Sequence, residues 1–178
     1  MSRITVRDKH FVLAIPEKEI IEAIAEIAEK MNQELNEMQP LFVCVLNGSF
    51  MFASDLMKQL NFPCEVTFIR LKSYAGTITV GNVKEVQGLV ENIENRNVVV
   101  IEDIIDTGHT VANLQEYLLS KKPQSVKIAT LLFKPEALVR NVKPDYVAMK
   151  IPNDFVVGYG LDYDGYGRNF RDIYRVEC

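Results

Sequence analysis

The sequence predicts an α/β fold built on a mainly parallel sheet flanked by helices, and three observations lead to it. The chain has 178 residues, which suits one domain with a single large core. Apolar runs of strand length alternate with segments of helical periodicity along most of the chain. Some of these runs are apolar at every position, as is typical of parallel strands that are buried on both faces.

The first half of the sheet is predicted by one amphipathic helix and the strand after it. Residues 17–38 follow a proline and place their apolar side chains on one helical stripe. The stripe consists of Ile20, Ile24, Ile27, Met31 and Leu35. Pro40 marks the end of this helix, and residues 41–46 form a continuous apolar strand. A turn at residues 47–49 then leads into a second helix, which we expect at residues 50–60.

The second half of the chain repeats the alternation. Further strands are predicted at residues 65–72, 83–86, 97–101, 125–133 and 146–149. Residues 73–82 are polar, contain glycine and lack periodicity, so we expect a mobile excursion there. A helix at residues 110–119 follows the strand at residues 97–101. Residues 151–178 are rich in Tyr, Asp, Gly and Arg, and we expect them to form a cap rather than more sheet.

Composition narrows the class of protein. Hydrophobic residues make up 48% and charged residues 25% of the chain, the balance of a folded protein. The net charge of −4 argues against a broad nucleic-acid surface, which needs clustered Lys and Arg. The first ten residues contain no apolar signal region, and no segment approaches the roughly 20 apolar residues that span a bilayer. Cys44, Cys64 and Cys178 show no paired spacing, so we expect free thiols in a cytoplasmic protein.

The strongest chemical signal follows the strand at residues 97–101. Ligands of open parallel sheets bind beyond the carboxyl ends of the strands, and this strand is followed there by acids, hydroxyls and a glycine. Thr107 and Thr110 can donate O–H groups, and Gly108 permits a backbone that other residues avoid. Amides at the start of the following helix, together with its dipole, favour an anion. The turn is therefore predicted to hold a phosphate group.

Three carboxylates in this segment suit other tasks. The oxygens of Glu102 and Asp103 are of the kind that Mg²⁺ and ribose hydroxyls accept. The plain alternative is that acids end the strand in solvent and a threonine caps the helix. At ~6 Å and an effective dielectric constant of ~20, Asp106 would repel a bound phosphate by about 3 kcal/mol. A neighbouring positive charge or a role as proton acceptor would explain Asp106, and stabilisation by the helix dipole is the alternative.

The segment at residues 102–110 resembles the phosphoribosyl pyrophosphate signature of the hypoxanthine (hypoxanthine-guanine) phosphoribosyltransferases, within the type I phosphoribosyltransferases. The resemblance extends over residues 42–168 through several separate motifs. It implies a single domain over residues 1–178, in which residues 151–178 contribute a small cap, or hood, over the base site. It also implies that the 5′-phosphate is bound by Asp106, Thr107, Gly108, His109 and Thr110.

Flanking motifs carry further roles that the resemblance implies. Residues 46–52 are similar to the family's pyrophosphate loop, in which Asn47 and Gly48 offer backbone amides to pyrophosphate. Ser73 and Tyr74 resemble the start of the flexible loop that closes over the family's active site. Arg168 matches an arginine that approaches pyrophosphate. Without the resemblance, these would be a structural turn, a surface loop and a solvated charge.

The same resemblance assigns the base site. Lys134 matches the lysine that contacts the oxygen at carbon six of the purine, which would reject adenine, since adenine presents a donor there. Phe155 is expected to stack on the base and Val156 to read it through backbone groups. Asp162 is expected near the base and on Mg²⁺, which would make Glu102 and Asp103 its companions as metal ligands. Taken alone, Lys134 would be a loop lysine and Phe155 a core residue.

The resemblance implies a purine salvage transferase. Such an enzyme converts hypoxanthine and guanine with phosphoribosyl pyrophosphate to IMP and GMP, with Mg²⁺ as cofactor and Asp106 as the base for the N7 proton. A xanthine-preferring relative and a regulator that binds effector or RNA without turnover are the alternatives. A flavodoxin-like module would not explain Lys134 and the paired acids. No nucleic acid or membrane partner is expected, and the family implies a homo-oligomer, either a dimer or a tetramer.

Overall fold

A six-stranded sheet forms the centre of the protein in the computed structural model, which describes residues 3–72 and 84–177. Its order is β5-β4-β3-β6-β7-β8, and all neighbours are parallel except β4 and β5 at one edge. The strands are β3 (Leu41–Leu46), β4 (Glu65–Lys72), β5 (Lys84–Gln87), β6 (Asn97–Ile105), β7 (Ser125–Phe133) and β8 (Tyr146–Lys150). The predicted mainly parallel α/β fold is confirmed.

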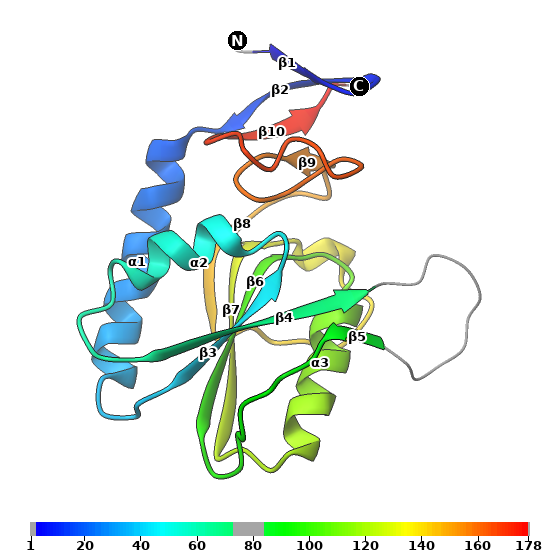
Figure 1. Cartoon of the computed structure of the whole chain (residues 1–178). Coiled ribbons are helices and arrows are strands. Elements are labelled where there is room, and N and C mark those ends of the chain that lie inside the picture. Colours follow the sequence, from blue (N-terminus) through cyan, green and yellow to red (C-terminus); the bar gives the residue numbers. More distant parts are fainter. Residues whose placement is uncertain (1–2, 73–83, 178) are drawn as a thin grey trace.

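Helices cover both faces of this sheet (Figure 1). On one face, α1 (Glu17–Leu35) and α2 (Phe50–Met57) share a buried cluster with alternate residues of β3 and β6, such as Cys44. On the other face, α3 (His109–Ser120) packs on the remaining residues of the same strands. A short 3-10 helix, η1 (Pro135–Ala137), follows β7. Burial raises the pKa of Cys44 to about 12, as is typical of an unreactive thiol in a core.

Most element boundaries match the predictions, and the strands at residues 41–46, 65–72 and 125–133 match at both ends. For the strand predicted at residues 97–101, the predicted end is wrong, because β6 continues to Ile105. Pairing with β7 persists up to Ile105 and Phe133, so Glu102 and Asp103 lie inside the strand. The first two helices end three residues before their predicted ends. The excursion predicted at residues 73–82 lies outside the described residues.

A second, antiparallel sheet lies above α2 and joins the two ends of the chain (Figure 1). It has the order β1-β2-β10-β9, with β1 (Arg3–Val6), β2 (Lys9–Ile15), β9 (Val156–Val157) and β10 (Ile173–Val176). The expectation that residues 151–178 add no sheet is therefore wrong. The tail finds its partner strands at the start of the chain, where Phe11 is buried against Val157 and Tyr174. We call this sheet and the loop between β9 and β10 the hood.

The hood packs directly on the main core. Val156, Tyr159, Leu161 and Ile173 belong to the same buried cluster as the inner faces of α1 and α2. Their burial fixes the hood over the end of the sheet where β3 gives way to α2. Among the described residues, no helix is long and apolar enough to cross a membrane.

Candidate active site

Two adjacent acids lie near the carboxyl end of β6, Glu102 buried and Asp103 half-buried. Glu102 is 7% exposed, and its Oε2 atom has no hydrogen-bond partner among the described residues. Burial, followed by the neighbouring charge of Asp103, raises the pKa of Glu102 well above its usual value. Burial also raises the pKa of Asp103, although the Ile104 amide, which donates to its Oδ1 at 2.8 Å, acts in the opposite direction. Buried acids of this kind are costly unless a proton or a cation balances them.

The loop after β3 lies directly on this acidic pair. A Cβ atom added to Gly48 would lie 1.4 Å from Oδ2 of Asp103, so only glycine fits there. Asn47 is exposed beside it, after a cis peptide bond to Leu46. The next residue, Ser49, is buried and donates from its hydroxyl to the Val45 carbonyl at 2.7 Å. The structure thus brings the predicted pyrophosphate loop to the predicted acids.

The predicted phosphate loop connects β6 to α3. Gly108 caps α3 with a left-handed backbone (φ 81°), and an added Cβ would lie 3.1 Å from Leu138. The carbonyl of Thr107 accepts the backbone amides of Val139 at 3.0 Å and Arg140 at 3.1 Å. These bonds hold the loop against the chain after β7. The side chains of Thr107 and of residues 109–110 remain exposed, where a ligand can reach them.

Asp106 and Lys134, which the sequence assigned separately to phosphate and base, form an ion pair. Nζ of Lys134 lies 2.8 Å from Oδ2 of Asp106. The lysine side chain is 6% exposed and the aspartate side chain 45% exposed. The Lys134 amide also donates to the Ile105 carbonyl at 2.9 Å, which ties the end of β7 to the end of β6. This cation is the neighbouring positive charge that the position of Asp106 calls for.

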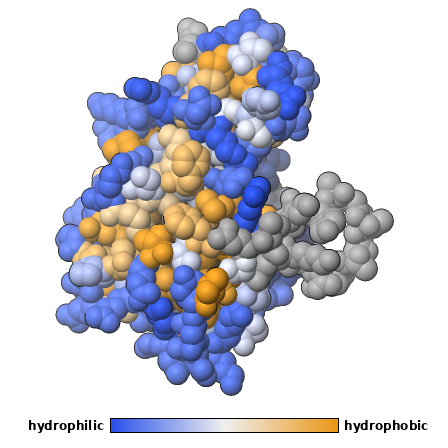
Figure 2. Space-filling view, in the orientation of Figure 1, coloured by the Kyte–Doolittle hydropathy of each residue, from blue (hydrophilic) through white to orange (hydrophobic). Residues whose placement is uncertain are grey.

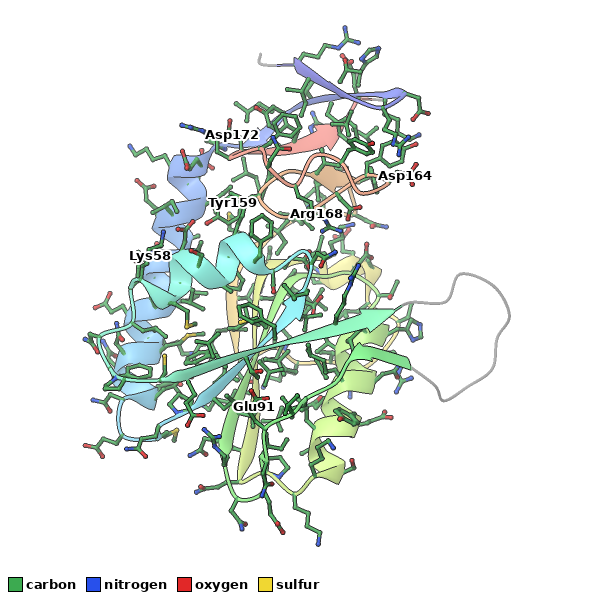
Figure 3. The ribbon with its side chains drawn as sticks, viewed as in Figure 1. Lys58, Glu91, Tyr159, Asp164, Arg168 and Asp172 are labelled. Carbon is green, nitrogen blue, oxygen red and sulfur yellow. The ribbon has the colours of Figure 1, made fainter. Side chains whose placement is uncertain are left out.

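Arg168 and Asp162 are paired within the hood. Nη2 of Arg168 lies 2.7 Å from Oδ1 of Asp162, and Nη1 donates to the Gly160 carbonyl at 2.7 Å. Figure 3 shows Arg168 on the side of the hood that faces α2. Asp162 is therefore held by an arginine and not gathered with the acids of β6. Within residues 3–72 and 84–177, no group of three or more acidic, histidine or cysteine side chains is arranged to hold a metal ion.

Phe155 presents a half-exposed ring at the start of β9. It is 44% exposed and packs edge-on to Tyr163, with ring centroids 5.7 Å apart. The buried ring of Phe11 supports it from β2 at 6.1 Å. Val156 follows in β9 and pairs with Arg175. Phe11 and Tyr163 escaped the sequence reasoning, although residues 11–15 form an apolar run of strand length.

Ser73 and Tyr74, the predicted start of the flexible loop, lie outside the described residues. The other predicted site residues occupy two neighbouring regions. The carboxyl ends of β3, β6 and β7 supply residues 47–48, 102–103, 106–110 and 134, and the hood supplies residues 155–156, 162 and 168. The contact that connects the two regions lies at the loop after β3. A Cβ added to Gly160 of the hood would lie 2.0 Å from the Gly48 carbonyl.

A parallel sheet with paired acids near the end of a central strand, a glycine-capped loop after it, and a hood in contact with the loop after β3 is the architecture of a type I phosphoribosyltransferase. Comparison with known proteins agrees, because the family described as "Phosphoribosyl transferase domain" matches residues 14–164. The chain belongs to this family of enzymes, within its hypoxanthine-guanine phosphoribosyltransferase branch.

The relatives that place the chain in this branch match most of its length. The hypoxanthine-guanine phosphoribosyltransferase of Streptococcus thermophilus (strain CNRZ 1066) is 41% identical over 154 residues, 86% of each chain. That of Streptococcus mutans is 42% identical over 158 residues, 88% of this chain and 86% of the relative. A crystal structure of a hypoxanthine phosphoribosyltransferase from Staphylococcus aureus is 36% identical with a TM-score of 0.89, covering 93% and 91% of the two chains. The crystal structure of a hypoxanthine-guanine phosphoribosyltransferase from Bacillus anthracis is 34% identical with a TM-score of 0.87. The match covers 94% of this chain and 97% of that chain.

Proposed function

We propose that this enzyme transfers the phosphoribosyl group of phosphoribosyl pyrophosphate to hypoxanthine and guanine, forming IMP and GMP and releasing pyrophosphate. The observation that carries the proposal is the buried ammonium of Lys134, paired with Asp106 where the phosphate loop begins. A cation in this place can donate a hydrogen bond to a purine oxygen, and the carboxylate of Asp106 would then face the ring nitrogen next to that oxygen. The names of the relatives support the same substrates.

Base selection follows from the donor chemistry of Lys134. An ammonium group has three protons to donate and cannot accept, so it can hold Asp106 and still donate to an oxygen at carbon six. The amino group of adenine would meet it donor to donor, which costs roughly 1–3 kcal/mol for each unpaired neutral group. The half-exposed ring of Phe155 is available for stacking. Among the described strands, β9 lies at the edge of the hood sheet, which leaves Val156 backbone groups for the base.

Two backbone cradles are assigned to the phosphates. The loop at residues 106–110 opens α3, whose first amides and dipole favour the 5′-phosphate. The backbone of the exposed Asn47 and of the buried Gly48 beside it, with the guanidinium of Arg168, is assigned to pyrophosphate. Binding at these two places, remote from the anomeric carbon, would position the reacting bond.

The acids of β6 fit a divalent cation. Among the described residues, Oε2 of Glu102 is buried without a hydrogen-bond partner and Asp103 lies beside it, so hard oxygen ligands are available there. We assign Mg²⁺ to Glu102 and Asp103, and Asp162, which lies apart from them in the hood, would hold Mg²⁺ that is bound together with pyrophosphate. When bound, Mg²⁺ would neutralise charge on the departing pyrophosphate. The same two acids would otherwise accept hydrogen bonds from the ribose hydroxyls.

The chemical step exchanges one bond for another at the anomeric carbon. N9 of the purine forms a bond to this carbon as the bond to the pyrophosphate oxygen breaks, and the electrons of that bond leave with pyrophosphate. The purine must lose its N7 proton, and Asp106 is the acceptor that we assign. Lys134 remains paired with the aspartate, so it balances the charge until the proton arrives.

A base-competition assay tests the proposal. The protein is mixed with Mg²⁺, phosphoribosyl pyrophosphate and equal hypoxanthine, guanine, xanthine and adenine, and the nucleotides and pyrophosphate are measured. We expect IMP and GMP, with no AMP. A product dominated by XMP would favour a xanthine-preferring enzyme. Absence of pyrophosphate with every base, together with retained nucleotide or RNA binding, would point to a regulator and refute transfer.

We also propose that the enzyme works in the cytoplasm as a homo-oligomer. Phe50, Val66 and Phe68 are each at least 40% exposed, and Figure 2 shows apolar surface over α2 and β4 on this face. Clustered apolar side chains of this kind support contact between copies. Light scattering of the wild type and of Phe68→Glu tests the proposal, with a lower mass expected for the variant. A monomeric wild type would contradict it.

A further inference from the structure

Tyr159 is a fully buried tyrosine at the junction of the hood and the main core. It lies after β9, is 0% exposed and has a left-handed backbone (φ 49°), which non-glycine residues adopt only where their surroundings hold them. Its hydroxyl donates to Oδ2 of Asp55 on α2. Figure 3 shows the Tyr159 side chain between the hood and α2. The proposed mechanism gives it no role.

The bond between these two side chains joins a neutral donor to a charged acceptor. Burial, and then the hydrogen bond to Asp55, raise the pKa of Tyr159 above its usual value, so the phenol keeps its proton. The other oxygen of Asp55 pairs with the exposed ammonium of Lys58 at 2.5 Å. Hydrogen bonds with one ionised partner are roughly twice as strong as neutral ones. This bond is therefore strong enough to fix the position of the loop that carries Tyr159.

The residue after Tyr159 touches the pyrophosphate loop. A Cβ on Gly160 would lie 2.0 Å from the Gly48 carbonyl, so the two backbones are in direct contact. Gly48 in turn lies against Asp103, as described above. The helix that carries Asp55 begins at Phe50, two residues after Gly48. The side-chain bond and the backbone contact therefore hold the same two segments together.

The same hood loop positions Arg168. Gly160 donates its amide to the Arg168 carbonyl at 2.9 Å and accepts Nη1 of Arg168 at 2.7 Å. Movement of Gly160 away from the core would therefore move the guanidinium that we assign to pyrophosphate. The buried Tyr159 hydroxyl therefore affects the position of both groups proposed to hold pyrophosphate, the Gly48 backbone and Arg168.

We propose that Tyr159 is a positioning residue whose hydrogen bond to Asp55 sets the spacing between the hood and the pyrophosphate loop. Base recognition in the hood and pyrophosphate binding at Gly48 are coupled through this bond. The inference rests on the proposed function, because that function assigns the two ligands. Both side chains act through Gly160 and Gly48 and leave the substrate to other groups.

The test removes the hydroxyl and keeps the ring. In the reverse reaction, from IMP and pyrophosphate, Tyr159→Phe should raise the KM for pyrophosphate and lower kcat, each by about tenfold, because a charged hydrogen bond is lost. The KM for IMP should rise less than the KM for pyrophosphate, since the phosphate loop is untouched and only the base contacts in the hood are affected. Asp55→Ala should show the same pattern, and the double variant should be no worse than either single variant. Asp55→Asn keeps an acceptor oxygen and should restore most of the activity.

Tyr174→Phe is the matched control. Tyr174 is also buried in the hood, but its hydroxyl donates to Oδ2 of Asp172 at 3.2 Å. Oδ1 of Asp172 accepts the Glu17 amide at 2.8 Å, so this hydroxyl faces the start of α1 rather than the pyrophosphate loop. Removal of the Tyr174 hydroxyl should lower Tm about as much as Tyr159→Phe does and leave the KM for pyrophosphate at the wild-type value.

Calorimetric binding of Mg²⁺-pyrophosphate to each variant separates this inference from the proposed function. Weaker pyrophosphate binding in Tyr159→Phe and Asp55→Ala, with Asp55→Asn close to wild type, supports positioning. A Tyr159→Phe protein with a lower Tm but unchanged pyrophosphate affinity and kcat would overturn it. If Tyr159→Phe does not fold, the comparison of Asp55→Ala with Asp55→Asn decides in the same way. A wild type that binds pyrophosphate but makes no nucleotide contradicts the function alone.

Discussion

Replacing Asp106 with asparagine separates proton transfer from binding at the proposed site. Asparagine keeps the size of the side chain and one oxygen that can accept the Lys134 hydrogen bond, but it cannot take up the N7 proton. General-base catalysis contributes about 10²- to 10⁴-fold, so we expect kcat to fall by ~10²-fold or more. That fall corresponds to at least about 2.7 kcal/mol of activation free energy. IMP binding should survive, because the backbone amides of the loop remain.

The structure also sets the expected cost in stability. At the observed 2.8 Å and an effective dielectric constant of ~20, the attraction between Lys134 and Asp106 is about 6 kcal/mol before screening. The Asp106 side chain is 45% exposed, so water reduces this to about 1–2 kcal/mol. Asparagine retains part of the hydrogen bond, which leaves a loss of about 1 kcal/mol. For a chain of this size, Tm should fall by roughly 2–4 °C.

The assay combines turnover at saturating substrates, calorimetric IMP binding and thermal melts. Glu136→Gln is the control, because it removes one carboxylate from the exposed turn after Lys134. It should leave kcat and IMP affinity unchanged. A kcat for Asp106→Asn within about threefold of wild type, with normal IMP binding, would remove Asp106 from proton transfer. Loss of IMP binding together with turnover would show that the carboxylate anchors the loop instead.

Three further predictions concern other charged groups. Lys134→Gln replaces the charged donor, so kcat/KM for hypoxanthine should fall by about 10- to 100-fold and the preference for hypoxanthine over adenine should narrow. An unchanged base preference would contradict the assignment of Lys134 to the base. Glu102→Gln removes the charge of a buried acid that has no hydrogen-bond partner among the described residues, so Tm measured in chelator should rise while kcat/KM falls. A lower Tm would contradict the expected gain in stability. The Tyr146 hydroxyl is the main cause of the lowered pKa of Glu34. A lowered pKa stabilises the fold only where the acid is ionised. The loss of Tm in Tyr146→Phe should therefore be largest above pH 4.5 and shrink as the pH falls further. A loss of Tm that does not depend on pH would exclude this linkage.

The parallel sheet could be predicted because its signal is local. Residues 41–46 form a strand that is buried along almost its whole length, and their continuous apolar run reports burial on both faces without knowledge of the partner. The end of β6 could not be predicted in this way. Glu102 and Asp103 read as the end of a strand, but the neighbouring β7 continues the ladder to Phe133. The partner strand, rather than the polarity of the two acids, decides where β6 stops.

The hood could not be predicted because its contacts join residues far apart in the chain. Tyr174 of β10 pairs with Leu13 of β2, and nothing in either segment identifies its distant partner strand. The Lys134–Asp106 pair was within reach of the sequence. Each residue follows one of two adjacent parallel strands, whose carboxyl ends lie at the same edge of the sheet. Topology would have brought them together before any coordinates were known.

The distribution of charge indicates what kind of affinity the site can offer. The chain carries a net charge of −4, and its substrate as proposed is a polyanion, so the overall field opposes binding. The two cations assigned to the ligands are each already paired, Lys134 with Asp106 and Arg168 with Asp162. Attraction must then come from short-range groups: the amides at the start of α3, the Gly48 backbone and a cation at Glu102. Groups of this kind act only when the ligand is correctly placed, which favours selectivity over rapid capture.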